Sequence, residues 1–506
     1  MIDIILSDKA YENDIYPLVK AFYPNETIKV VKENLTELKI SQQEACDSED
    51  KDHDAEYFKK DITLWIDFYV ERIIVRFRKG HTSFDKSLAL DERLTKSQYK
   101  NTIKRFLYDL LSEQTGSHLP WGILTGIRPT KLVYDMLVQG KSEEEIYRNM
   151  KEEYYCSEGK TSMSIQIARR ERKLLEEMVY KNGYSLYIGI PFCPSTCLYC
   201  SFTSYSIEKF ANLVEDYLEA LEKEIEFAAS CFPDKPLTTV YFGGGTPTTL
   251  TASQLDHLLG ILRRKFDFTH VKEFCVEAGR PDSITRDKLE VLKKWGVDRI
   301  SINPQSMNQK TLDLIGRKHT IQQVEEAFAL AREVGHDNIN MDIIIGLTGE
   351  NPQDVSNTLK KIEKLNPESL TVHTLAVKRA ARLNIEREAY DNLQASGVST
   401  MLEDVIHFAK EHSYLPYYLY RQKNMAENLE NIGYSKYGRE GLYNILIMEE
   451  KQTILALGAG AMSKFVFHLE NRLERVDNVK SVTDYISRID EMIMRKQKFI
   501  NDNPGI

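Results

Sequence analysis

The sequence has no excess of positive charge. Its 506 residues include 67 Lys and Arg against 76 Asp and Glu, a formal net charge of −9. A protein that binds nucleic acid needs a basic face for the phosphates, so we expect no nucleic-acid partner. No apolar run reaches the roughly 20 residues that a membrane-spanning helix needs. The first residues, Met1–Lys9, are charged from the start and lack the apolar stretch of a signal peptide. We therefore expect a cytoplasmic protein without a membrane span.

Cysteine is scarce, with seven in the chain. An odd and small number of cysteines does not make a disulfide framework, and it favours a reducing compartment with thiols that bind metal. Three of them, Cys193, Cys197 and Cys200, form a C-x3-C-x2-C group directly after a strand-like run. The other four are expected to be unreactive small apolar side chains: Cys46, Cys156, Cys231 and Cys275.

This group lacks a fourth cysteine, because Ser201 and Phe202 occupy the next positions. A structural zinc site is closed by four protein ligands, and iron–sulfur clusters are usually held by four thiolates. Three thiolates can hold three corners of a cubane and leave the fourth iron open. The missing ligand therefore predicts a reactive iron–sulfur cluster and not a structural metal site.

Two changes of pattern divide the chain into three predicted domains. Residues 1–175 mix strand-like and helical runs and are predicted to form an α+β domain. From about residue 184 short apolar runs alternate with amphipathic segments, which predicts parallel strands covered by helices. Six such units over residues 176–384 fit a partial (β/α)6 barrel, and residues 385–506 are predicted to form a mainly helical domain that packs on it. The six predicted strands lie at residues 186–190, 239–242, 273–277, 299–303, 340–345 and 369–373.

The ends of these predicted strands carry residues suited to binding a ligand. The first strand leads to the three cysteines, and the second to Gly243–Pro247, where missing side chains allow backbone N–H groups to approach a ligand. Glu277, Gln305 and Asp342 belong to the third, fourth and fifth strands. A buried carboxylate is costly unless it is paired, so the two acids indicate a site. Chemistry in such barrels lies at the carboxyl ends of the strands, which predicts one common site.

The runs Tyr187–Cys200 and Gly243–Thr248 resemble the radical S-adenosylmethionine (SAM) enzymes. More narrowly, they resemble the oxygen-independent coproporphyrinogen III oxidase (dehydrogenase) family, which is also similar at residues 296–306, 315–320 and 340–347. The resemblance covers residues 180–465, and the N-terminal run Gly122–Lys131 resembles the HemZ branch of that family.

This resemblance implies a [4Fe–4S] cluster on Cys193, Cys197 and Cys200, with SAM on the open iron. It implies one SAM molecule at Glu277 and a second at Gln305, Arg317, Asp342 and Ala376. The residues that it places around SAM are Tyr187, Tyr199, Gly244, Gly245, Thr246, Glu277, Gln305, Arg317, Asp342, Ala376 and Met462.

The implied reaction belongs to haem biosynthesis. Reductive cleavage of SAM would give a 5′-deoxyadenosyl radical, which takes a β-hydrogen from a propionate side chain. Loss of CO2 and one electron leaves a vinyl group, and two rounds convert coproporphyrinogen III to protoporphyrinogen IX. A reductant such as flavodoxin or ferredoxin would be the protein partner. The carboxylates of the tetrapyrrole substrate need cations, for which the candidates are Arg128, Lys131, Arg317, Lys378 and Arg379.

Two positions depart from the family's pattern. Its proven enzymes carry His where this chain has Gly189 and a fourth Cys where it has Phe202, and haem-carrying relatives share the Phe. Tyr187 is the expected catalytic substitute for that histidine, with His373 as the other nearby group. Two alternatives stay open: a non-catalytic haem-binding or haem-delivery protein, and another radical SAM reaction on a tetrapyrrole, such as methyl transfer that opens the haem ring.

Overall fold

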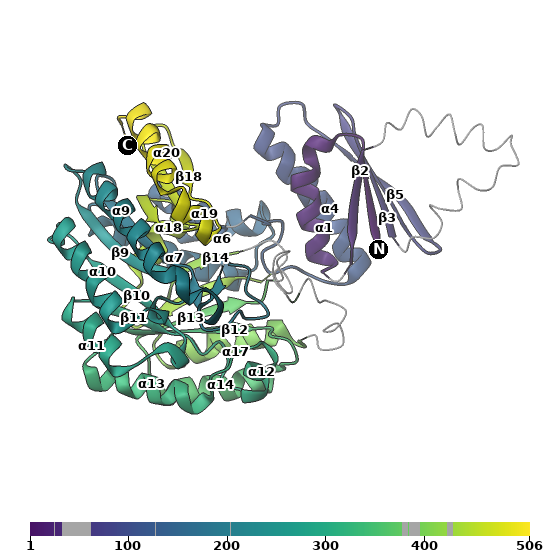
Figure 1. The fold of residues 1–506 in the computed structure, drawn as a ribbon. Coiled ribbons are helices and arrows are strands. Elements are labelled where there is room, and N and C mark those ends of the chain that lie inside the picture. The colour runs from purple at the N-terminus through teal and green to yellow at the C-terminus, as the bar shows by residue number, and fades with distance from the viewer. Residues whose placement is uncertain are drawn as a thin grey trace, which may run out of the picture. The chain divides into compact units, whose positions relative to one another are not determined.

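The structure is a computed structural model that describes residues 1–24, 26–32, 62–126, 128–202, 204–376, 383, 395–421 and 429–505 (Figure 1). Cys46, Lys378 and Arg379 lie outside the described residues. The chain divides into two compact units, an N-terminal unit, Met1–Ile165, and a C-terminal unit, Gln166–Ile506. Within the described residues, no helix is both long and apolar enough to cross a membrane.

The N-terminal unit is built on a five-stranded sheet with the order β2-β1-β3-β4-β5. Ile4 and Leu64 on neighbouring strands pack in one apolar core with Leu18 and Leu107 from two helices. The sequence predicts one strand-like run over residues 65–77, but this run turns at Tyr69, whose N–H donates to the Arg72 carbonyl. The strands are β1 Ile2–Leu6, β2 Ile28–Lys32, β3 Ile62–Phe68, β4 Arg72–Lys79 and β5 Thr82–Ala89. The helices are α1 Glu12–Phe22, α4 Lys96–Thr115, α5 Thr130–Val138, α6 Glu143–Glu152 and α7 Glu158–Glu176, which spans the division between the units.

The C-terminal unit contains six parallel strands in the order in which they occur in the chain, as predicted. They are β6 Tyr184–Ile190, β9 Leu237–Gly244, β10 Glu273–Gly279, β11 Arg299–Ile302, β12 Ile339–Ile345 and β13 Ser369–Thr374. Figure 1 shows helices on the outer side of this sheet. They are α9 Val214–Cys231, α10 Ala252–Lys265, α11 Arg286–Lys294, α13 Ile321–Val334 and α14 Pro352–Leu365. Thr251, Thr320 and Asn351 begin three of them with capping boxes.

The C-terminal residues contain helices, as predicted, and also strands that the sequence analysis did not predict. These strands lie at both edges of the same sheet, because the full order is β14-β15-β13-β12-β11-β10-β9-β6-β16-β17-β18. They are β14 Leu415–Tyr420, β15 Asn431–Ser435, β16 Thr453–Leu457, β17 Met462–Phe467 and β18 Arg472–Asp477. The helices are α17 Val398–Glu411, α18 Leu442–Glu449, α19 Val482–Ser487 and α20 Ile489–Asp502. The division into three domains stays a prediction.

A buried ion pair joins α20 to α9. Lys496 and Glu224 are both fully buried, and their side chains lie 2.6 Å apart. The Glu224 carboxylate also accepts hydrogen bonds from the Tyr485 hydroxyl (2.6 Å), the Asn478 amide (2.8 Å) and the Gly458 N–H (2.8 Å). A Cβ on Gly458 would lie 2.6 Å from the Gly189 carbonyl oxygen. The pair therefore fixes a turn that lies directly behind the end of β6.

Candidate active site

The three cysteines lie on one loop at the end of the first barrel strand. Cys193 ends the short strand β7, Phe192–Cys193, which pairs with β8, Tyr205–Ser206, and closes the loop. Cys197 is buried, and the other two are partly exposed. Burial raises the pKa of Cys193, and it raises the pKa of Cys200 to about 11, in each case with a further increase from neighbouring cysteines. The thiols are therefore close enough to act on one another.

Each sulfur has a hydrogen-bond donor, as the ligands of metal sites commonly do. The Thr246 hydroxyl donates to Cys193 Sγ (3.5 Å), the Phe202 backbone N–H to Cys200, and the Arg317 guanidinium to Cys197. No three His, Cys, Asp or Glu side chains among the described residues are gathered closely enough to hold a single metal ion. A cubane binds each thiolate to a different iron, so it needs thiols on one loop and not thiols that meet at one point.

The glycine run Gly243–Thr246 attaches the second strand to the cysteine loop. The Gly245 N–H donates to the Ile190 carbonyl and the Thr246 N–H to the Phe192 carbonyl, each at 2.7 Å. A Cβ on Gly245 would lie 2.5 Å from the Phe192 oxygen, so any side chain would push the two segments apart. The N–H groups of Gly245 and Thr246 are therefore used within the protein and do not face a ligand. This run can present to a ligand the Thr246 hydroxyl and the backbone surface of glycines that have no side chain.

Glu277 lies on β10 among tyrosines. The Tyr241 hydroxyl donates a short hydrogen bond to Glu277, and the Tyr241 ring is stacked on Tyr443 with 4.3 Å between ring centroids. Tyr187 stacks on the same pair, at 6.2 Å from Tyr241. Burial raises the pKa of Glu277 to about 7; the Tyr241 hydrogen bond lowers it, and nearby Asp342 raises it. The Glu277 carboxyl is therefore partly protonated near neutral pH. A cation that binds beside it favours the ionised form.

Asp342 on β12 is ionised despite its burial. Burial alone would raise its pKa, but hydrogen bonds and the charge of His373 outweigh that effect, so the pKa is lowered. The Asn340 amide donates to Asp342 at 2.7 Å, and His373 Nε2 lies 3.7 Å away. His373 Nδ1 lies 3.4 Å from the Tyr420 hydroxyl. The far side of the barrel thus carries a charged carboxylate next to an imidazole.

Gln305 and Arg317 are buried with polar atoms that lack a partner. Gln305 is 8% exposed and has φ +67°, a conformation that is strained for a residue with a side chain, and its Oε1 has no hydrogen-bond partner in the described residues. Arg317 is 5% exposed and donates to the Asn303 carbonyl and to Tyr199, yet its Nε has no partner there. Unsatisfied buried groups are rare and costly, so these residues fit a polar ligand such as SAM.

The remaining predicted residues are spread over the unit. Tyr199 packs in a small apolar cluster with Ile315 and Leu347. Ala376 is half-buried two residues beyond β13, and Met462 begins β17 with 43% of its surface exposed. Arg128 and Lys131 belong to the N-terminal unit. The cysteines, Glu277, Asp342, Gln305 and Arg317 are therefore the predicted residues with the clearest structural support.

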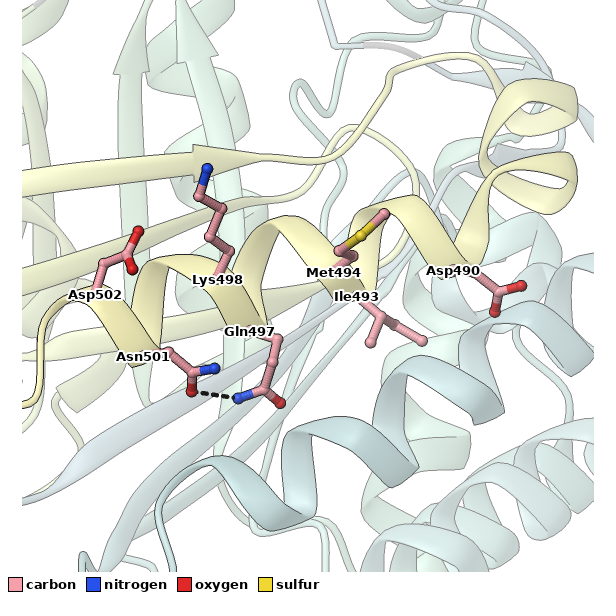
Figure 2. Close-up of a pocket in the computed structure, with 7 residues that line it drawn as sticks. All are labelled: Asp490, Ile493, Met494, Gln497, Lys498, Asn501 and Asp502. Atoms are coloured by element: carbon pink, nitrogen blue, oxygen red, sulfur yellow. Dashed lines mark hydrogen bonds between the residues drawn. The ribbon is translucent and has the colours of Figure 1, made fainter.

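The pocket in Figure 2 does not contain any predicted site residue. It is a depression of about 480 Å³ along the exposed side of α20, and its lining residues all belong to that helix. Gln497 and Asn501 in its wall are hydrogen-bonded to each other at 2.8 Å. A shallow surface formed by one helix cannot enclose a radical reaction, which requires that water be kept out. The candidate site is the set of polar side chains on the inner side of the sheet, next to the cysteine loop.

Sequence reasoning missed Tyr241, Tyr443 and Arg280. The two tyrosines look like core residues in the sequence, because Tyr241 lies in the middle of a strand and Tyr443 in the first turn of a helix. Arg280 follows β10 directly in the run Gly-Arg-Pro-Asp, and it is 3% exposed. An arginine shortly after a predicted strand, with an aspartate two residues later, is all that the sequence shows of it, because its burial and its contact with Ser195 are visible only in the structure.

Comparison with protein families matches residues 187–362 to the radical SAM superfamily. The oxygen-independent coproporphyrinogen-III oxidase-like protein HemZ of Bacillus subtilis is 44% identical over 427 residues, which are 84% of this chain and 85% of that protein. The heme chaperone HemW of the same organism is 36% identical over 38% of this chain and 51% of its own length. The family resemblance inferred from the motifs is confirmed.

Among solved structures, coproporphyrinogen III oxidase (HemN) from Escherichia coli, described as a radical SAM enzyme, is similar with a TM-score of 0.51 and 24% identity. The similarity covers 64% of this chain and 73% of that one. The mixed α/β fold predicted from the alternating pattern is confirmed as the radical SAM fold. Membership of this superfamily implies a [4Fe–4S] cluster and SAM as cofactors.

Proposed function

Because this chain belongs to the radical SAM superfamily, in its family of oxygen-independent coproporphyrinogen III oxidase-like proteins, we propose that it decarboxylates coproporphyrinogen III to protoporphyrinogen IX. Cys193, Cys197 and Cys200 would hold the cluster, and flavodoxin or ferredoxin would reduce it. When bound, the cluster and SAM supply the radical chemistry that removes a hydrogen atom from a propionate side chain. The observation that carries the proposal is the three-cysteine loop beside the unsatisfied Gln305 and Arg317.

The residues around the loop have separate tasks in this proposal. Arg317 and Thr246 hydrogen-bond to the sulfurs of Cys197 and Cys193 and would orient them toward the cluster. Glu277 and Asp342 supply carboxylates for the cationic SAM, while the free atoms of Gln305 and Arg317 supply an acceptor and a donor. Tyr199, Gly244, Gly245, Ala376 and Met462 would complete the surroundings of one or two SAM molecules.

Haem delivery without catalysis is the alternative that a specific observation favours. Gly189 has no side chain, and Phe202 next to Cys200 is 70% exposed, which suits contact with a flat apolar macrocycle. HemW, a heme chaperone, is among the relatives. Mass analysis of the tetrapyrrole after anaerobic incubation with SAM separates the three proposed functions. A divinyl product supports decarboxylation, and an unchanged tetrapyrrole supports haem delivery. A methylated or opened ring supports another radical SAM reaction.

Removing either carboxylate should weaken SAM binding and leave the cluster in place. Glu277→Ala and Asp342→Ala each delete one charge-assisted interaction with a cation, worth about 1.5–3 kcal/mol. The measurement is SAM affinity of the reconstituted protein, with deoxyadenosine release in dithionite as a second readout. Glu219→Ala, an exposed glutamate on α9, is the matched control. Unchanged affinity in either variant would remove that residue from the SAM site.

The pKa of Glu277 adds a dependence on pH to the same experiment. Its carboxyl has a pKa of about 7 and is partly protonated at neutral pH. A bound cation favours the ionised form, so SAM binding should release a proton, and the affinity should rise from about pH 6 to about pH 8. Glu277→Gln should flatten this rise, and a rise of the same size in that variant would contradict the role of Glu277.

Tyr187→Phe should lower turnover with the cluster intact. The phenol is the group nearest Gly189 on the same face of β6, since a Cβ on Gly189 would lie 3.9 Å from the Tyr187 hydroxyl oxygen and 3.3 Å from its ring. Gly189→His should still fold, because Gly189 does not have a positive φ, so a side chain causes no backbone strain there. The new Cβ would lie 3.2 Å from the Leu457 carbonyl oxygen, and this crowding should cost about 1–3 kcal/mol of unfolding free energy. Turnover and thermal unfolding are the measurements. Full turnover in Tyr187→Phe would shift the catalytic role to His373.

A further inference from the structure

A buried arginine joins the end of β10 to the middle of the cysteine loop. Arg280 is 3% exposed, and its Nη1 donates to Ser195 twice, to Oγ at 2.6 Å and to the carbonyl oxygen at 3.1 Å. Ser195 lies between Cys193 and Cys197 in the C-x3-C segment. The contact therefore fixes the backbone that separates two of the three thiols.

A carboxylate holds the other side of the guanidinium. Arg280 Nε and Nη2 donate to the two oxygens of Asp282 at 2.9 and 2.7 Å, a two-armed pair that lysine cannot reproduce. Burial raises the pKa of Asp282, but the hydrogen bond and charge of Arg280 outweigh it and the pKa is lowered, so the pair is ionised. A buried charge is tolerated when it is paired and hydrogen-bonded in this way.

The same serine extends the contact to a second segment. Ser195 Oγ, which accepts from Arg280, lies 3.2 Å from the Gly316 carbonyl and donates to it. The Leu198 N–H donates to the Ile315 carbonyl at 2.9 Å, so the loop is attached on two sides. The Arg280 guanidinium is charged at any physiological pH, so the same two hydrogen bonds place a positive charge against the loop between Cys193 and Cys197. Arg280 thus affects both the shape of the loop and the charge around it.

We propose that Arg280 is a positioning residue for the iron–sulfur cluster: it fixes the backbone between Cys193 and Cys197, and it places a buried positive charge beside the cluster. The proposal rests on the proposed role of the three cysteines as ligands. Groups that support metal ligands set both the retention of the metal and its reduction potential. A positive charge nearby stabilises the reduced, more negative cluster, so it makes reduction easier.

Four variants separate the shape of the loop from its charge. Arg280→Gln removes both contributions, and Arg280→Lys keeps the charge without the two-armed contact. Ser195→Ala removes the hydroxyl's hydrogen bonds with Arg280 and Gly316 but keeps the hydrogen bond from Arg280 to the Ser195 carbonyl. Arg286→Gln, which changes an arginine that is 48% exposed on α11, is the control. Each protein is reconstituted anaerobically, and two quantities are measured: the rate of iron loss to excess EDTA, and the midpoint potential from a redox titration followed by electron paramagnetic resonance.

We expect Arg280→Gln to lose iron about 10- to 100-fold faster than the unmodified protein, with a midpoint potential shifted to more negative values. Arg280→Lys should also lose iron faster but keep the unmodified potential, and Ser195→Ala should lose iron at an intermediate rate. Equal iron loss in Arg280→Gln and the unmodified protein overturns the proposal. If Arg280→Gln does not fold, unchanged iron loss in Ser195→Ala overturns it. If the unmodified protein takes up no cluster, the assignment of the cysteines fails instead.

Discussion

Replacing Cys193, Cys197 or Cys200 with Ala should abolish the iron–sulfur cluster and all SAM cleavage. Each thiolate binds a different iron of the cubane, so two remaining ligands hold only half of it. The unmodified protein, purified anaerobically, should contain about four irons per chain and show broad visible absorption from thiolate-to-iron charge transfer. The three variants should show neither, and iron analysis with visible spectroscopy measures both.

The other described cysteines provide the controls for this experiment. Cys156 and Cys275 are buried. Burial raises the pKa of Cys275, and it raises the pKa of Cys231 to about 12, which keeps these two thiols protonated and unreactive. Alanine at any of these positions should leave the iron content unchanged. A cluster that survives the loss of Cys197 would refute the assignment of the ligands.

Breaking the buried pair of Glu224 and Lys496 should cost about 3–5 kcal/mol of unfolding free energy. Lys496→Met leaves the fully buried Glu224 carboxylate without its cation, and Glu224→Leu leaves the Lys496 ammonium without its anion. Removing the carboxylate also frees the Gly458 N–H behind β6. Denaturant unfolding of the single variants and of Glu224→Leu/Lys496→Met measures the effect.

An exposed pair on the same face of the unit gives the reference. Lys265 and Glu226 join α10 to α9 at 3.0 Å, with 44% and 62% of their side chains exposed. Lys265→Met should cost less than about 1 kcal/mol. The double variant at the buried pair should recover part of the loss, because no charge remains unpaired. If Lys496→Met lowers the unfolding free energy by less than about 1 kcal/mol, the ion pair between α20 and α9 contributes little to the stability of the unit.

The six parallel strands could be predicted because each is a short apolar run between amphipathic helices. Ile321–Val334 is one of these helices, and its bounds are marked in the sequence, since Thr320 caps its start and Gly335 ends it in a left-handed conformation. The edge strands were missed for a physical reason. β18, Arg472–Asp477, is half exposed and charged, so the sequence carries no apolar run there. β15 and β16 join the sheet through β13 and β6, which are distant in the chain, so nothing local in the sequence marks their pairing.

The candidate site was predictable where a residue type is chemically unusual in its place. A three-cysteine group and acids on buried strands are such signals. The structure has the three cysteines on one loop and the acids on strands of one sheet. Arg280 was not predictable in this way, because its importance depends on Ser195, 85 residues earlier in the chain. The glycine run illustrates the same limit, since the N–H groups of Gly245 and Thr246 donate to the carbonyls of Ile190 and Phe192 and do not point outward.

The most direct test of the proposed function is the mass of the tetrapyrrole that the reconstituted protein produces from coproporphyrinogen III under anaerobic conditions with SAM and a reductant. We predict conversion to protoporphyrinogen IX through a monovinyl intermediate, with deoxyadenosine released in step, and no conversion by the Cys197→Ala variant. Release of deoxyadenosine without any vinyl product would contradict the substrate, and the absence of both from a protein with a full cluster would contradict the proposed function.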